Sequence, residues 1–259
     1  MLAAAASSAA GAATLHFGSL PHPGFMDMAA TDLERQLDNP VWSCLTTRHA
    51  HLALGDARVR RYPPEFSPIT GFPATGEPSV EALEPLVDVG EDMGAIGPRV
   101  PVLSSNWETV LETRLAQMIR IERKPLPEGD VESVALGGSD VDDMLALVEM
   151  THPGPFRLRT VELGNFIGIR ERGRLVAMAG ERMWVGDCRE VSGICTHPDV
   201  QRRGYARALT GRVVNRMLRA GQTPFLHVIA TNIGAIETYR ALGFERRAEF
   251  PLLHAKRVR

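Results

Sequence analysis

The strongest constraint on the fold is a regular succession of strand and helix signals in the second half of the chain. Alternating apolar stretches that are joined by short turns, Arg172-Gly173 and Gly186-Asp187, are typical of consecutive antiparallel strands. They predict three such strands, at residues 165–170, 174–184 and 189–196. A chain with this pattern has to build its core around a sheet.

Helices and further strands surround these three strands. A strand at 131–136 and a helix at 140–150 precede them; Ser139, with Asp142 three residues later, caps this helix. The prolines of the loop at 151–156 end it. The three strands are followed by a helix at 204–220 and a strand at 224–230. A helix at 232–242, which Gly243 ends, and strand material at 244–258 complete the chain. This order predicts an α/β fold, with a mixed sheet and helices on its faces.

The first half of the chain carries weaker signals. We expect a helix at 41–47, one or two strands within 50–62, a Pro-rich loop at 63–73, a helix at 80–87, a turn and strand at 90–101, and at 107–121 a segment that begins as helix and finishes as strand. Residues 124–127 read as a linker. The sequence therefore predicts a divergent N-terminal α/β region at 28–125 and a second domain at 130–259.

Residues 1–27 are rich in Ala and Ser and contain neither Lys nor Arg, since the first basic residue is Arg35. Secretory and Arg-rich transit peptides both need early positive charge, so neither is indicated. We expect a disordered leader or a mis-called start upstream of Met26 or Met28. The sequence contains no apolar stretch that would span a membrane.

The three cysteines, Cys44, Cys188 and Cys195, are odd in number and form no CxxC pair. This usage indicates neither a disulfide framework nor a metal site, and it fits a cytoplasmic protein. The net charge of −2 is unevenly spread, because the residues from His197 onward hold twelve Arg/Lys against four Asp/Glu. A small polyanionic ligand explains this basic segment. Nucleic acid is not expected, since aromatic residues are not interleaved with the basic ones.

A candidate anion site follows the third of the three strands. The turn Gln201-Arg202-Arg203-Gly204-Tyr205-Ala206 leads into a predicted helix, so unpaired backbone N–H groups and the helix dipole point at whatever lies beyond it. Gly204 allows close approach of a ligand, and the small Ala206 leaves room for it. The turn therefore predicts a cradle suited to a diphosphate.

Residues 190–206, Glu-Val-Ser-Gly-Ile-Cys-Thr-His-Pro-Asp-Val-Gln-Arg-Arg-Gly-Tyr-Ala, resemble motif A of the GNAT superfamily of acyl-CoA N-acyltransferases. A second match lies about 30 residues further on and is similar to that family's Asn-x-x-Ala-x-x-x-Tyr-x-x-x-Gly-Phe signature: Asn232, Ala235, Tyr239, Gly243 and Phe244. The resemblance covers about half of the chain, whereas residues 28–125 resemble the N-terminal halves of two-part GNAT enzymes only loosely. It implies a GNAT fold with a divergent N-terminal half, and acetyl-CoA as acyl donor.

The resemblance also implies residue roles. The donor's diphosphate would lie at Gln201, Arg202, Arg203, Gly204, Tyr205 and Ala206. Its pantetheine arm would lie at Asn232 and Ala235. Its acetyl end would lie along the main chain of Ile194, Cys195 and Thr196. Tyr239 would be the general acid; it lies two helical turns after Asn232, on the same face. The plainer alternatives are a helix cap for Asn232 and core packing for Tyr239.

A base is needed because a primary amine is mostly protonated at neutral pH. Glu190 occupies the place of the base in the histone-acetyltransferase branch of the family, and strand alternation puts it on one face with Ser192, Ile194 and Thr196. Glu181 is its rival, and either residue could instead be a structural acid paired with an arginine. A covalent role for Cys195 is disfavoured, because no activating partner is visible in the sequence.

The loop at 151–159 lies where GNAT enzymes enclose their acceptor. Phe156, Arg157 and Arg159 could grip an amine that also carries a carboxylate, or the loop could be only a stiffened surface segment. The sequence predicts an N-acetyltransferase that acts on a primary amine of a small molecule or peptide by direct attack, with a homodimer possible. The alternatives are an amino-acid N-acyltransferase that uses a larger acyl-CoA and a non-catalytic CoA-binding sensor or scaffold.

Overall fold

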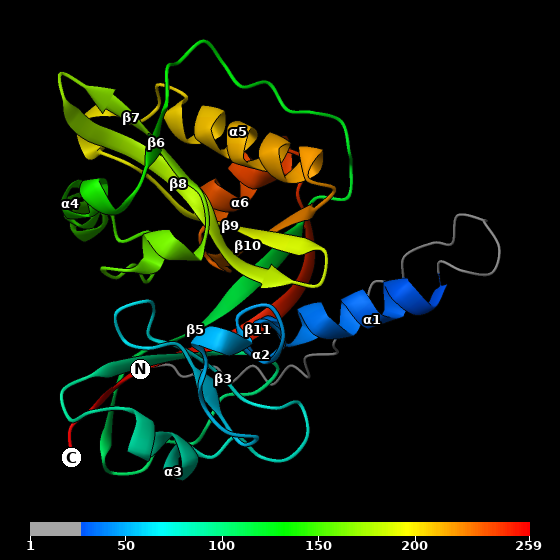
Figure 1. The fold of residues 1–259 in the computed structure, drawn as a ribbon, viewed down its shortest axis with the longest axis vertical. Helices are drawn as coiled ribbons and strands as arrows, with labels where there is room; N and C mark the ends of the chain where they lie inside the picture. Colours follow the sequence, from blue (N-terminus) through cyan, green and yellow to red (C-terminus); the bar gives the residue numbers. More distant parts are fainter. Residues whose placement is uncertain (1–26) are drawn as a thin grey trace, which may run out of the picture.

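The structure, a computed structural model, describes residues 27–259, with side chains from Leu33 on. All strands within this range belong to one mixed sheet with the order β1-β2-β3-β4-β11-β5-β10-β9-β8-β7-β6 (Figure 1). The predicted α/β fold class with a mixed sheet is thereby confirmed. Most of the expected leader, residues 1–26, lies outside the described residues.

The upper part of the sheet in Figure 1 comes from the second half of the chain. Its strands are β6 (Val134–Leu136), β7 (Phe166–Glu171), β8 (Arg174–Val185), β9 (Cys188–Thr196) and β10 (Thr223–Ile229). Helix α4 (Val141–Thr151) packs on one face of these strands. Helices α5 (Tyr205–Arg219) and α6 (Ile233–Ala241) pack on the other. Every strand and helix expected at 130–242 is present, with bounds that differ by at most three residues.

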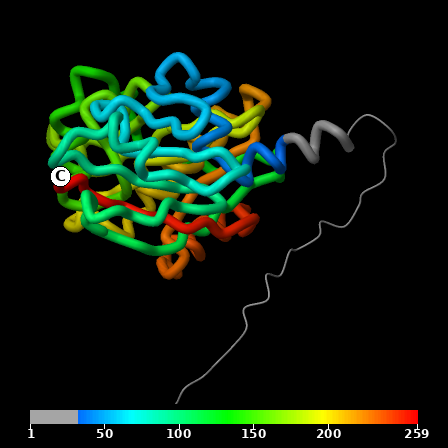
Figure 2. The backbone as a smooth tube through the Cα atoms, turned by 90° about the horizontal axis from the view of Figure 1, so that it is seen from below, coloured from blue at the N-terminus to red at the C-terminus, as the bar shows by residue number. Residues whose placement is uncertain are grey.

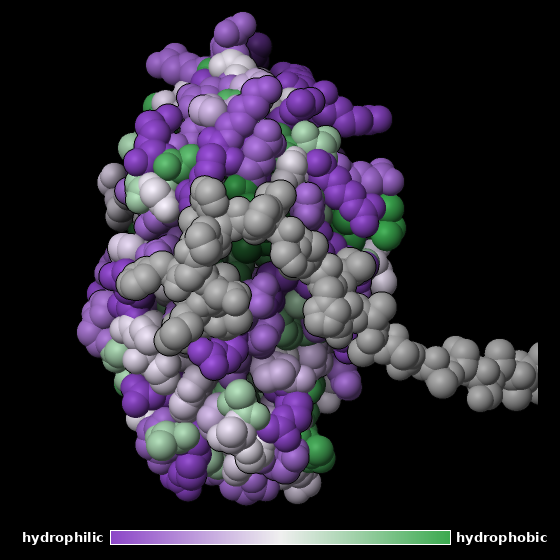
Figure 3. Space-filling view, turned by 90° about the vertical axis from the view of Figure 1, so that its right-hand side faces the viewer, coloured by the Kyte–Doolittle hydropathy of each residue, from purple (hydrophilic) through white to green (hydrophobic). Residues whose placement is uncertain are grey.

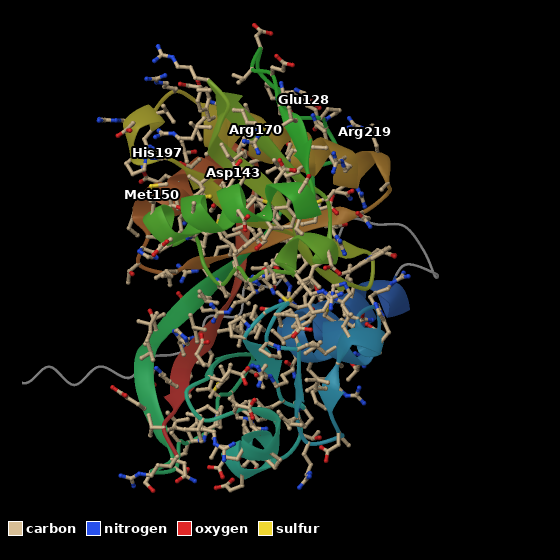
Figure 4. The ribbon with its side chains drawn as sticks, turned by 60° about the vertical axis from the view of Figure 1, so that its left-hand side comes forward. Glu128, Asp143, Met150, Arg170, His197 and Arg219 are labelled. Atoms are coloured by element: carbon tan, nitrogen blue, oxygen red, sulfur yellow. The ribbon has the colours of Figure 1, made fainter. Side chains whose placement is uncertain are left out.

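Polar contacts tie these elements together. Arg170 of β7 donates to Asp143 of α4 at 2.6 Å, and both side chains can be followed in Figure 4. The linker is bound to α5, because the backbone N–H of Leu126 donates to Oδ1 of Asn215 on that helix at 2.7 Å. Glu128 lies 3.8 Å from Arg219 at the end of the same helix. The segment between the two halves of the chain is therefore held against α5.

The first half of the chain builds the lower part of the sheet. It contains α1 (Asp27–Asp38), α2 (Pro40–Thr46), β1 (Leu54–Gly55), β2 (Arg60–Arg61), β3 (Ile69–Gly71), α3 (Val80–Leu83), β4 (Asp92–Ile96) and β5 (Trp107–Ile119). One helix here had not been expected, and two expectations were wrong. Asp27–Asp38 forms a helix that was not predicted, and β3 lies inside the expected loop at 63–73, where it pairs with β2 and β4. Trp107–Ile119 is strand throughout, because its whole length pairs with β11.

Two long strands join the halves. Strand β5 lies between β10 and β11 (Glu245–Arg257), antiparallel to both, and β11 continues alongside β4. Figure 2, from below, shows the red β11 beside the green β5 across the molecule. A strand from the N-terminal region thus completes the sheet of the C-terminal one. The division into units at 28–125 and 130–259 stays a prediction.

The surface shown in Figure 3 is mainly hydrophilic, with hydrophobic residues scattered among the polar ones. Among residues 27–259, no helix combines the length and apolar character needed to cross a membrane. Among the side chains that the structure describes, from Leu33 on, no group of three His, Cys, Asp or Glu is arranged to hold a metal ion.

Candidate active site

The central feature of the site is a gap between two neighbouring parallel strands. Strands β9 and β10 pair only at Cys188, Arg189 and Glu190, opposite Thr223, Pro224 and Phe225. Beyond Glu190 the two strands separate, while β10 stays paired with β5 as far as Ile229. The last residues of β9 therefore line an opening in the middle of the sheet.

A β-bulge at Gly193 shapes this opening. The β8–β9 register shifts between Ser192 and Cys195, and Gly193 has φ +63°. Because a bulge inserts one residue, it reverses the alternation of side chains after it. Ile194 accordingly packs with Val191 in the core beneath α5, and Cys195 packs in the core beneath α4. The prediction that Glu190, Ser192, Ile194 and Thr196 share one face was therefore wrong.

The predicted anion cradle adjoins the end of β9. Arg202 has φ +62° and Gly204 has φ +83°, and α5 begins directly afterwards without a side-chain cap. An added Cβ at Gly204 would meet no atom within 4 Å, so the space before the helix is open. The first backbone N–H groups of α5 are thus left to an external acceptor, as a diphosphate group requires.

Some side chains of this turn form hydrogen bonds or ion pairs within the chain, and others do not. Arg203 lies 3.3 Å from Glu171, and the hydroxyl of Tyr205 donates to the same carboxylate at 2.5 Å. Gln201 donates to the carbonyl of Thr196 at 3.5 Å. Arg202 is exposed and has no ion pair within the described chain. The backbone N–H groups of this turn, more than its arginine side chains, are therefore available to bind an anion.

An orphaned hydroxyl lies at the end of β9. Oγ1 of Thr196 is buried and has no hydrogen-bond partner among the described residues. A buried polar group without a partner costs free energy, so it marks a place where a ligand atom would be stabilising. The gap and the open turn before α5 fit an elongated ligand of the CoA type, and the Thr196 hydroxyl is a free polar group beside them in the sequence.

Helix α6 carries the second set of expected residues. Oδ1 of Asn232 accepts a hydrogen bond from the N–H of Ala235 at 3.1 Å, so Asn232 is the N-cap of α6. The ring of Tyr239 packs edge-on against Phe244, at 6.2 Å between centroids, and burial raises the pKa of Tyr239 to about 12. Its hydroxyl has no hydrogen-bond partner within residues 27–259. Tyr239 is therefore a packed side chain whose proton stays in place at neutral pH.

Glu190 lies in a closed polar cluster at the last β9–β10 pair. Its side chain is 1% exposed and accepts two hydrogen bonds from Arg182, at 2.8 and 3.0 Å, and one from Nδ1 of His227 at 2.8 Å. Burial opposes its charge, but Arg182 and His227 outweigh burial and lower the pKa of Glu190 to about 2. A carboxylate with so low a pKa is a weak base.

The hydrogen bonds around His227 define its tautomer. Oε1 of Gln117 accepts from Arg247 at 2.9 Å, so Nε2 of Gln117 must be the donor toward Nε2 of His227, at 3.2 Å. Nδ1 of His227 faces the Glu190 carboxylate, which can only accept, so Nδ1 carries a proton and donates it to Glu190. Sequence reasoning identified neither Arg182 nor His227, which lie 8 and 37 positions from Glu190 and carry no local signal.

The carboxylate of Glu181 also has hydrogen-bond partners within the chain. It is 4% exposed and accepts hydrogen bonds from Nε of Arg189 at 3.2 Å and from the amide of Asn165 at 3.1 Å. Both candidate bases are therefore paired with arginines, which favours the alternative of structural acids.

Cys195 is buried, and burial raises the pKa of its thiol to about 11, so that the nucleophilic thiolate is scarce at neutral pH.

The acceptor loop is attached to the N-terminal region. Phe156 is buried edge-on against Phe166, with 5.5 Å between ring centroids. Arg157 donates to both oxygens of Asp92 at 2.6 and 2.7 Å, and Arg159 pairs with Glu162 at 2.7 Å and Glu65 at 3.5 Å. The expectation that these two arginines grip an acceptor carboxylate therefore does not match the structure, because protein carboxylates already occupy them.

The fold and the separated strands define a class of protein, the GNAT-type acyltransferases, and comparison with known proteins agrees. Residues 166–251 match the family described as FR47-like protein. The chain is 33% identical to a protein from Novosphingobium aromaticivorans assigned to the GNAT family of acetyltransferases; the match covers 85% of this chain and 98% of that one, with a TM-score of 0.76. The chain therefore belongs to the GNAT family.

More distant structures share the fold alone. A GCN5-related N-acetyltransferase from Kribbella flavida is 16% identical over 90% of this chain and 96% of its own, with a TM-score of 0.54. A GCN5-related N-acetyltransferase-like protein from Streptococcus suis is 13% identical over 88% and 98%, with a TM-score of 0.50. No curated protein matches the sequence.

Proposed function

We propose that this GNAT acyltransferase moves the acetyl group of acetyl-CoA to a primary amine of a small molecule or peptide, by direct attack in a ternary complex. The observation that carries the proposal is the gap between β9 and β10, since β9 leads directly into the open turn before α5; the orphaned Thr196 hydroxyl lies at the end of the same strand. An elongated ligand with an anionic end would lie along the gap and the turn.

The residues that would hold the donor come from β9, α5 and α6. Backbone N–H groups at Gln201–Ala206 would bind its diphosphate, and Asn232 and Ala235 its pantetheine arm. The main chain of Ile194, Cys195 and Thr196 would face its acyl end, where an N–H group can stabilise negative charge that develops on a carbonyl oxygen. When bound, acetyl-CoA supplies an activated thioester carbonyl.

Tyr239 is the proposed general acid. Because burial raises its pKa to about 12, the phenol is protonated at every physiological pH. A thiolate leaving group needs a proton, and the hydroxyl of Tyr239 is not committed to another acceptor in the described chain. The side chain can therefore donate its proton in the step that releases the thiol.

Glu190 and Glu181 are proposed to position the strands. Glu190 holds β8, β9 and β10 together through Arg182 and His227, where the gap begins. A base with a pKa near 2 removes a proton from an ammonium group poorly. The acceptor amine is therefore expected to enter as its neutral form and to lose its second proton to water.

The test is free-CoA release with a panel of amines, combined with calorimetric titration of acetyl-CoA and longer acyl-CoA donors. We expect acetyl-CoA to bind and at least one amine to stimulate CoA release above hydrolysis. Preference for a longer acyl-CoA would support the amino-acid N-acyltransferase alternative. Tight CoA binding without turnover on any amine would support the sensor alternative.

A further inference from the structure

An open cavity of about 440 Å³ lies between the two halves of the chain. The first half contributes Arg48, His49, His51 and Leu52, and the second half contributes residues 162–165 with Trp184 and Arg189. We propose that this cavity binds the carboxylate of an acceptor that carries both an amine and a carboxylate. This inference rests on the proposed function, because it names the acceptor's class.

The charges around the cavity favour an anion. Arg48 is exposed and its guanidinium stacks on the ring of Trp184 at 4.5 Å, yet it pairs with no carboxylate within the described chain. Glu162, the acidic residue of the lining, is paired with Arg159 at 2.7 Å. Arg48 is thus a free cation at the wall, held in place by an aromatic ring.

The indole of Trp184 provides an independent observation. Two guanidinium groups, those of Arg48 and Arg189, lie over the ring at 4.5 and 5.1 Å from its centroid. Its Nε1 is buried and has no hydrogen-bond acceptor among residues 27–259. A carboxylate oxygen between the Arg48 guanidinium and the indole edge would give both donors an acceptor, after a rotation of the exposed Arg48.

The position of the cavity sets the length of the acceptor. Arg189 lines the cavity, and Ile194, where the acyl end of the donor is proposed to lie, follows five positions later on β9. Five strand residues span at most about 17 Å. An acceptor that spans this distance needs an amine several bonds away from its carboxylate, as in an ω-amino acid or a lysine side chain. An α-amino group alone is too close to its own carboxylate.

The test is calorimetric titration of the full chain, without acyl donor, with 6-aminohexanoate, its uncharged counterpart 6-aminohexanamide, and inorganic phosphate. We expect the acid to bind and the amide to bind roughly 10- to 100-fold more weakly, as loss of a charge-assisted hydrogen bond implies. Arg48→Gln should weaken binding of the acid by a similar factor. The matched control, Arg58→Gln, removes an exposed arginine of the same region outside the cavity and should bind as the wild type.

Several results would overturn the inference: equal binding of acid and amide, wild-type affinity in Arg48→Gln, tighter binding of phosphate than of the acid, or no binding of the acid at millimolar concentration. Failure of the proposed function is recognised separately. If acetyl-CoA does not bind, or CoA release requires no amine, the acyltransferase proposal fails while the titration still decides the carboxylate site.

Discussion

Nδ1 of His227 on β10 donates to Oε1 of Glu190 on β9 at 2.8 Å, next to the point where the two strands separate. Arg182 on β8 closes the other side of the carboxylate. Three strands therefore meet at one buried anion. Since the strands diverge directly beyond it, this cluster determines where the gap of the proposed acyl-donor site begins.

We predict that Glu190→Gln destabilises the protein by about 3–5 kcal/mol, because it leaves the buried charge of Arg182 without a partner. The pKa of Glu190 is about 2 in the folded state against an ordinary value of 4.5. The folded pKa is lowered, so its stabilisation is present above pH 4.5 and is lost as the pH falls toward 2, by about 3 kcal/mol. Urea denaturation between pH 3 and 7 measures both effects.

The control is Glu112→Gln, on an exposed position of β5, which should leave the free energy of unfolding nearly unchanged. Equal stability of Glu190→Gln and the wild type at pH 7 would contradict the structural role that we assign to Glu190.

The elements of the second half could be predicted because their signals are local. Turn residues and alternation mark β7, β8 and β9, and Gly243 marks the end of α6. Strand β5 lacked such a signal: its periodicity fits helix and strand alike, and its partners in β11 lie more than 120 positions away. Its conformation is decided by pairing, which a local pattern does not show.

The residues of the candidate site also fall into those that a local sequence signal predicts and those that depend on distant parts of the chain. The turn at Gly204 and the cap at Asn232 depend on neighbouring residues and appear in the sequence as motifs. The alternation argument for Glu190 failed because it treated β9 as regular, whereas Gly193 introduces a bulge. The partners of Glu190 and Arg157 come from other elements, so the sequence could not show that these charges are already paired; Arg159 differs, because its partner Glu162 is only three residues away.

Gly204→Glu should abolish acetyl-CoA binding, because it places a carboxylate in the open space before α5, where the diphosphate is proposed to lie. Gly76→Glu is a matched control. Gly76 has φ +80° against +83° for Gly204, and an added Cβ also meets nothing within 4 Å, so the backbone strain is similar. The measurement is the thermal shift given by acetyl-CoA. A normal shift in folded Gly204→Glu would exclude the turn as the diphosphate site.

Tyr239→Phe should lower kcat by roughly 10- to 1000-fold and leave the affinity for acetyl-CoA nearly unchanged, which is the usual effect of removing a general acid. The structure gives the reason: the phenol, with a pKa of about 12, keeps its proton until the leaving group takes it. Steady-state rates together with a binding titration test this prediction. Wild-type turnover would show that Tyr239 serves only to pack against Phe244.

Direct transfer predicts intersecting lines when initial rates are measured against both substrates, and Cys195→Ala should keep most of its activity because the thiol has a pKa of about 11. The rise of kcat/KM with pH should follow the acceptor's own pKa and shift when a less basic amine replaces a more basic one. Parallel lines would indicate an acyl-enzyme. A pH rise that stays fixed for all acceptors would point to a base on the protein.

Residues 130–259 alone should fail to fold, although the family motifs lie inside this range. In the full chain β5 fills the position between β10 and β11, and its Ala116 and Met118 belong to the same core cluster as residues of α5 and α6. Without β5, β10 and β11 would both expose long unpaired edges, which favours aggregation. Circular dichroism and size-exclusion chromatography of the fragment test this, and co-expression with residues 1–129 should restore a soluble complex. A soluble 130–259 fragment with a cooperative thermal transition would show that the C-terminal unit needs no strand from the first half.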